Sequence, residues 1–266
     1  MIWFLIKKNF FDGWENIINL VVPNLVCDVF VLTVFFGYRF FRFPFSIASL
    51  VIIFTGLTLL FVAAGAFGKN AFSIASFESA HVSSYFKNMG QAFKDYLKFG
   101  MITALVILSG VTGVPLYIGI NGFVGFMLAM ILFVFVLIML LGLQWFIPLK
   151  EILKLDFKKT FKKCFVILFD NFAFSIFMFV YAAFLLTVSV FLCLFMPGFS
   201  GIVLAYVNAL RLRLYKYDWL DQHSDLKNAV ARKNIPWEAL IKEDSDMLGK
   251  KSIRSLFKPY AGDHED

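Results

Sequence analysis

The stretch from Phe99 to Leu149 decides the fold, and it reads FGMITALVILSGVTGVPLYIGINGFVGFMLAMILFVFVLIMLLGLQWFIPL. These 51 residues include no Asp, Glu, Lys, Arg or His. A transmembrane helix needs about 20 predominantly apolar residues, so the stretch has room for two. Gly119 and Gly122 interrupt the apolar pattern near its middle. We therefore predict a tight helical hairpin with arms near Phe99–Ile118 and Phe123–Ile147.

The composition of the whole chain also indicates a membrane protein. Of its 266 residues, 60% are apolar and only 16% are charged, and the mean hydropathy is +0.79. Soluble proteins have roughly 25% charged residues. Because backbone polar groups in lipid must be satisfied within their own segment, the spans are predicted to be α-helical. We interpret the net charge of +7 as basic loops that face anionic lipid, and not as a nucleic-acid-binding surface.

Two further pairs of apolar segments flank the central hairpin. The first pair is predicted at Ile17–Gly37 and Phe45–Ala66, and the last at Phe172–Phe195 and Phe199–Leu210. Twelve residues are too short to cross a bilayer. We therefore predict that the last helix continues through about Tyr217, antiparallel to its partner, with its arginine side chains extended toward the headgroups.

A basic amphipathic segment precedes each pair, in residues 1–19, 68–98 and 150–170. The first is predicted to lie in the headgroup plane as an interfacial helix, because Lys7, Lys8, Asp12 and Glu15 alternate with aromatic residues. Either an ancient duplication or a repeated need for basic interface helices explains this threefold pattern. The predicted fold is an all-α polytopic membrane bundle of six spans, arranged as three hairpins with amphipathic elbow helices in residues 1–216.

The charge distribution predicts the orientation of the chain. Only Arg39 and Arg42 fall on one predicted face, while the other 23 of the 25 Lys and Arg residues fall on the opposite face. The positive-inside rule then places both termini in the cytoplasm. No small-residue cleavage site follows the first apolar run, so we expect no cleaved signal peptide. The polar tail, residues 217–266, is expected either to dock on the cytoplasmic face or to recruit a soluble partner.

Asp28 is the polar residue that the sequence singles out most clearly. It lies near the middle of the first span, where a charge costs at least about 2.5 kcal/mol on insertion scales. One interpretation is a proton or cation site that includes Asn24, beside the backbone loosened by Pro23. The other is a neutral carboxyl group that forms a hydrogen bond inside the bundle.

Asp170 and Asn171 form a second polar position, where the third elbow meets the fifth span. One interpretation adds them to the polar intramembrane or transport site of Asp28 and Asn24. The other, which we favour, is that both are helix N-caps at the headgroup level. Gln144 and Asn208 are predicted to form interhelical hydrogen bonds. The three isolated cysteines favour packing over disulfides or a metal site. No catalytic motif stands out, so we predict no catalytic residues, cofactor or metal.

Four segments resemble the YesL-like group of small bacterial membrane proteins. They are NLVCDVFVLT (residues 24–33), SSYFKNMGQAFKDYLKFG (83–100), FKKTFKKCFVILFDNF (157–172) and MPGFSGIVLAYVNALRLRLYKY (196–217). Asp28 departs from the group, which has apolar or small residues at that position. The resemblance implies a multi-pass membrane protein without established activity, sometimes linked with sugar uptake, and it supplies no catalytic residues.

Two functions remain open on the sequence. The first is a non-enzymatic accessory or scaffold protein of a membrane complex, associated with a transport system. The alternative is a small secondary transporter or channel that uses Asp28. The expected partners are the lipid bilayer and a protein of the membrane complex.

Overall fold

The computed structural model describes residues 1–39, 46–120, 122–222 and 235–249, and within these ranges all secondary structure is helical. Five segments are apolar and long enough to cross a membrane. They are Ile17–Arg39 (α2), Ile47–Ala75 (α3, Ile47–Ala66, and α4, Gly68–Ala75), Phe93–Ile118, Phe123–Leu153 and Phe172–Phe191 (α11). The chain is therefore an all-helical protein with apolar helices of membrane-spanning length. Residues 40–45, which include Arg42 and the predicted start of the second span, lie outside the described residues.

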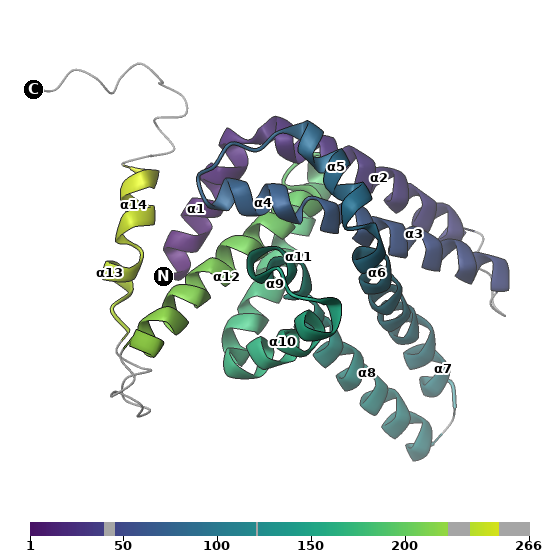
Figure 1. Cartoon of the computed structure of the whole chain (residues 1–266). Helices are drawn as coiled ribbons and strands as arrows, with labels where there is room; N and C mark the ends of the chain where they lie inside the picture. The colour runs from purple at the N-terminus through teal and green to yellow at the C-terminus, as the bar shows by residue number, and fades with distance from the viewer. Residues whose placement is uncertain (40–45, 121, 223–234, 250–266) are drawn as a thin grey trace, which may run out of the picture.

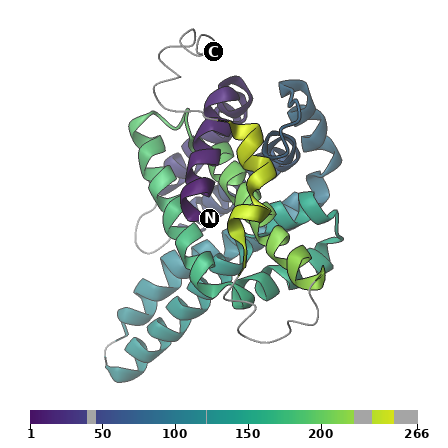
Figure 2. The same cartoon turned by 90° about the vertical axis from the view of Figure 1, so that its left-hand side faces the viewer.

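The central stretch forms two adjacent helical arms. The first comprises α6 (Phe93–Leu108), a π-helical turn (Ser109–Gly113) and α7 (Val114–Ile118), and α8 (Phe123–Leu143) is the second. Gly122 lies between them with a φ of 104°, a conformation that favours glycine. Figures 1 and 2 show the pair projecting from the rest of the molecule.

The second arm ends earlier than predicted. A turn at Gln144 and Trp145 separates α8 from α9 (Phe146–Leu153), so Pro148 lies inside a new helix and does not close the hairpin. Proline is tolerated in the first turn of a helix because the amide groups there have no intrahelical acceptor. The predicted arm to Ile147 was therefore too long by four residues.

The last helix is continuous, as predicted. Helix α12 extends from Gly198 to Gln222, past Tyr217. It is less apolar than the five segments named above and is not one of them. Gly198, at the beginning of α12, contacts Ser189 near the end of α11. Tyr217, near the end of α12, contacts Asn171 at the beginning of α11. The two helices are therefore antiparallel. Helix α11 ends at Phe191, four residues before the predicted Phe195.

Helix α12 also forms the centre of the packing. Its residues from Val203 to Leu210 are all buried, and it contacts α1 (Ile2–Glu15), α2, α4, α9 and α11. Because α12 is one uninterrupted helix across residue 217, the predicted domain boundary at 216/217 falls inside a helix.

The elbow segments are more divided than predicted. The second contains α4, α5 (Val82–Gln91) and the beginning of α6, and the third contains the second half of α9 and then α10 (Phe157–Asp170). The two helices of the third segment are separated near Lys154, which has a left-handed φ of 49°. In the tail, α13 (Trp237–Leu240) and α14 (Lys242–Leu248) lie beside α1 in Figure 2.

Candidate functional site

A buried charged cluster joins α1, α12 and α14. The ammonium group of Lys8 lies 3.0 Å from a carboxylate oxygen of Asp12, one turn later on α1. The two residues are only 1% and 5% exposed. Two of the charges that suggested an interfacial helix, Lys8 and Asp12, are therefore buried inside the protein. Helix α1 turns these charges toward α12, while Trp3 is 78% exposed on its outer surface.

An aromatic ring completes the surroundings of Lys8. The ring of Phe77 lies 3.6 Å from the Lys8 ammonium nitrogen, in cation–π contact. Phe77 follows the end of α4, and its φ of 60° is unusual for an aromatic residue. The amides of Phe77 and Glu78 donate to the carbonyls of Ile74 and Ser73, the pattern of a Schellman helix end. The helix end thus places the ring against Lys8.

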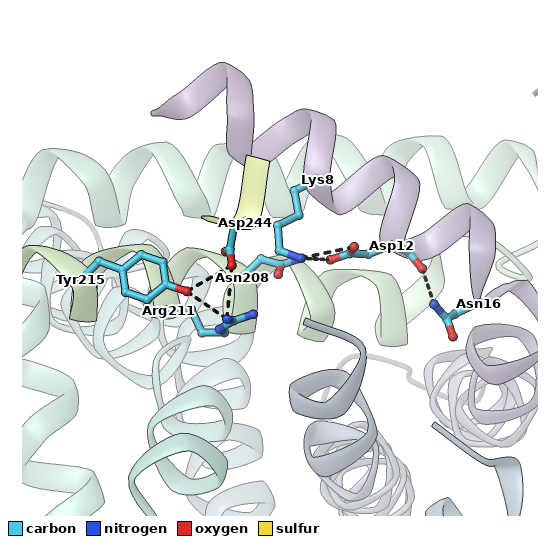
Figure 3. A network of polar contacts seen from close by, with 7 residues as sticks. All are labelled: Lys8, Asp12, Asn16, Asn208, Arg211, Tyr215 and Asp244. Atoms are coloured by element: carbon cyan, nitrogen blue, oxygen red, sulfur yellow. Dashed lines mark hydrogen bonds and ion pairs between the residues drawn. The ribbon is translucent and has the colours of Figure 1, made fainter. Parts of the chain in front are cut away.

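Helix α12 supplies the next contacts of the cluster. The side-chain amide of Asn208 donates to Asp12 at 3.0 Å. Arg211, one turn later, lies 3.6 Å from Asp244 of α14 and donates to the hydroxyl of Tyr215 at 2.9 Å. Figure 3 shows the side chains arranged along one side of α12. Two cations and two carboxylates are thus enclosed between three helices.

Burial and charge act in opposite directions on the Lys8–Asp12 pair. Burial raises the pKa of the Asp12 carboxyl group and lowers the pKa of the Lys8 ammonium group, because it disfavours both charged forms. The charge of each partner opposes these shifts, and Asn208 stabilises the carboxylate further. Three buried atoms of the cluster have no hydrogen-bond partner among the described residues: Oδ1 of Asn208, Nη1 of Arg211 and Oδ2 of Asp244.

Asn24 has a different role from the one that the sequence suggested. Its Nδ2 donates to the carbonyls of Phe195 and Pro197, and its Oδ1 accepts from the amide and hydroxyl of Ser200. A Cβ on Gly198 would lie 2.1 Å from the Asn24 amide nitrogen, so this approach requires glycine. Asn24 therefore attaches α2 to the turn that begins α12.

Asp28 lies one turn after Asn24 and does not share its contacts. The Asp28 side chain is partly buried, and its Oδ1 has no hydrogen-bond partner in the part of the chain that the structure describes. An apolar cavity of about 170 Å³ lies between α3, α6, α8, α11 and α12, and Asp28 is not part of its wall. The structure does not bring Asn24 and Asp28 together as one site.

Asp170 and Asn171 connect the α10–α11 junction to the end of α12. Asp170 lies 3.6 Å from the ammonium group of Lys216, and the hydroxyl of Tyr217 donates to its carboxylate. Asn171 is at the N-cap position of α11, but its side chain makes no capping hydrogen bond and contacts Lys216 and Tyr217 instead. The N-cap interpretation was therefore wrong for Asn171, because its side chain forms hydrogen bonds with Lys216 and Tyr217 of α12 and none that caps α11.

The two predicted interhelical amides do form such bonds. Gln144 donates to the carbonyl of Ser175 and accepts from the hydroxyl of Tyr206, both at 3.0 Å. Asn208 joins α12 to α1, as described above. Lys8 and Asp12 were not predicted as a site, although their spacing of four residues on one helix is typical of an ion pair.

Comparisons with known proteins add no assignment. No family model, curated protein or solved structure matches the chain. Within residues 1–39, 46–120, 122–222 and 235–249, no three His, Cys, Asp or Glu side chains gather in a group that suits a metal ion. What the polar clusters do in this structure is hold helices together.

Proposed function

We propose that the chain is a non-enzymatic accessory or scaffold protein of a membrane complex, associated with a transport system. One observation carries the proposal: α8 presents large apolar side chains on nearly every side of a projecting arm. The exposed ones are Phe123, Val124, Phe126, Met127, Leu128, Met130, Ile131, Phe133, Val134, Phe135 and Leu137. Figure 1 shows this arm at the lower right, away from α12 and α14.

The exposed arm supports a scaffold because of how helices associate in lipid. Lipid tails are as apolar as leucine, so association depends on close van der Waals packing. A projecting helix with aromatic side chains on several sides offers such contacts to the spans of another protein. The polar side chains of the fold are meanwhile used between its own helices, as at Asn24 and Gln144.

The orientation and the sixth span belong to the same proposal. We place α12 across the membrane as the sixth span, with both termini in the cytoplasm of a bacterium and three hairpins in all. The charge distribution supports this arrangement. The resemblance to the YesL-like group supports a role beside sugar uptake, and that link rests on the sequence segments alone.

A second function, a small transporter or channel, is favoured by the unpartnered oxygen of Asp28. In that case Asp28→Asn abolishes transport without lowering the amount of folded protein. In a structural role Asp28→Asn is mild, because an amide keeps its hydrogen-bonding capacity, whereas Asp28→Leu lowers abundance. A harmless Asp28→Leu contradicts both interpretations.

Site-specific photocrosslinking tests the scaffold. A crosslinking residue is placed at Ile131 or Phe135 on α8, and at Val180 or Phe184 on α11 as matched controls, all four being exposed apolar positions. The proposal expects a discrete protein adduct at the α8 positions and lipid adducts at the α11 positions. Lipid adducts alone at all four positions would contradict an α8-mediated complex.

A further inference from the structure

A polar cavity lies between α4 and α5, apart from the charged cluster and from the apolar cavity. Its volume is about 240 Å³, far more than one water molecule needs. Its lining residues include Lys69, Ser73, Ser79, His81, Ser84 and Lys87. These lining residues include two lysines, a histidine and three serines, and none of them is acidic.

Two buried asparagines fix the wall of this cavity. Asn70 and Asn88 are 3% and 6% exposed. The Asn70 amide donates to the carbonyl of His81 at 3.0 Å, and the Asn88 amide donates to Asn70 Oδ1 at 3.2 Å. The connection between the two helices is therefore held to α4, and the shape of the cavity exists before any ligand binds. Each side-chain amide also has a second N–H group beyond these bonds.

The charge of the cavity favours an anion. Lys69 and Lys87 approach from different helices and are both exposed, so their ammonium groups remain accessible. Glu151 of α9 attracts Lys69, but it is not a lining residue, and its carboxylate accepts a hydrogen bond from Tyr96. Two ammonium groups with serine hydroxyls match an anion that accepts several hydrogen bonds. We propose that this cavity binds a phosphate group.

The place of the cavity in the fold suggests where the phosphate comes from. Helix α4 ends one apolar segment, and α5 immediately precedes the next, which begins at Phe93. The side chains of Phe86, on α5, and Phe93, the first residue of α6, are 51% and 42% exposed. Aromatic side chains of this kind sit at the level of lipid headgroups. The phosphate is then the headgroup of an anionic phospholipid, and a soluble phosphate compound is the other source.

The test uses the full chain in a neutral detergent and measures its thermal unfolding midpoint against increasing ligand. Three probes are compared: inorganic phosphate, short-chain phosphatidylglycerol and short-chain phosphatidylcholine. Lys69→Gln/Lys87→Gln removes the cations, and Ser84→Trp fills the cavity without changing charge. Lys158→Gln/Lys159→Gln is the matched control, because it removes two exposed lysines from α10, outside the cavity.

Phosphatidylglycerol is expected to stabilise the protein more than phosphatidylcholine does. Both cavity variants should weaken its apparent affinity by about tenfold or more, and the control by less than about twofold. A different outcome is that inorganic phosphate raises the unfolding midpoint as much as the lipid does, with the same dependence on Lys69 and Lys87. That result supports phosphate binding in the cavity and identifies a soluble compound as the source. Equal losses in the cavity and control variants overturn the proposal, and so does full binding by Ser84→Trp.

Discussion

Helices α8 and α12 reverse the usual relation between hydrophobicity and burial. The segment that contains α8 has the highest mean hydropathy of the five apolar segments, 3.1, yet only 22% of that window is buried. Helix α12 carries Asn208, Arg211, Arg213 and Lys216, yet it is buried without a break from Val203 to Leu210. In water the more apolar helix would occupy the core.

The physical reason is that lipid does not drive apolar side chains out of contact with it. A phenylalanine on α8 loses little by facing acyl chains. An amide or a charge in hydrocarbon costs several kcal/mol unless it is paired, so polar groups gather where other helices can satisfy them. The polar positions of α12, such as Asn208 with Asp12, therefore draw α12 to the centre of the fold.

Topology reporters give the largest expected effect for the comparison of α8 with α12, because each reporter is either external or internal. Reporters fused after residues 40, 121 and 197 should be external, and those fused after 80, 157 and 230 internal. Opposite signals at 197 and 230 mean that α12 crosses the bilayer. The same signal at both would show that α12 is buried without spanning, and an internal signal at 121 would end the six-span arrangement.

Breaking the buried ion pair should cause the largest loss of stability. Lys8→Met leaves the Asp12 carboxylate buried between α1 and α12 without its cation, although the Asn208 amide still donates to it. Loss of one partner of a buried ion pair typically costs about 3–5 kcal/mol. Unfolding in mixed detergent micelles measures the change in free energy. Lys8→Met/Asp12→Leu should recover much of the loss. Lys159→Met is the control, because its ion pair with Asp156 is exposed and contributes less than about 1 kcal/mol. A double variant as unstable as Lys8→Met would contradict this account.

One identical substitution in each helix tests the contrast directly. Leu204 of α12 is 0% exposed and Leu128 of α8 is 40% exposed. Leu204→Ala should lower the free energy of unfolding by about 2–5 kcal/mol, because it leaves a cavity. Leu128→Ala should cost less than about 1 kcal/mol, because lipid fills the space. Equal losses at the two sites would mean that α8 is covered by protein in the state measured.

A smaller effect is expected where α2 holds the beginning of α12. Asn24→Leu removes the bonds to the turn before α12 and leaves groups such as the Ser200 amide without their partner. The expected cost is about 1–3 kcal/mol, measured in the same micelles. Thr33→Val on the same helix is the control, since the Thr33 hydroxyl donates to the carbonyl of Val29 within its own helix. An Asn24→Leu protein as stable as the control would argue against this anchor.

Much of the helical arrangement followed from local sequence. The uncharged stretch around Gly119 and Gly122 predicted the projecting arms, because both its length and its interruption are readable along the chain. The continuation of the last helix to about Tyr217 also followed, since twelve residues are too few for a bilayer. The end of α8 was misplaced because a proline marks a helix start as readily as a helix end.

The sequence by itself determined that this protein is helical and apolar, and where most of its long apolar helices lie. The tertiary structure alone decided which neighbour each polar face meets. Lys8 and Asp12 are buried, with Asp12 bonded to Asn208 of α12, and Asn24 contacts a turn more than 170 residues away instead of Asp28. Spacing along a helix fixes which side chains lie on one face, but the partner of that face depends on long-range packing. In lipid, that packing follows from satisfying a few polar groups.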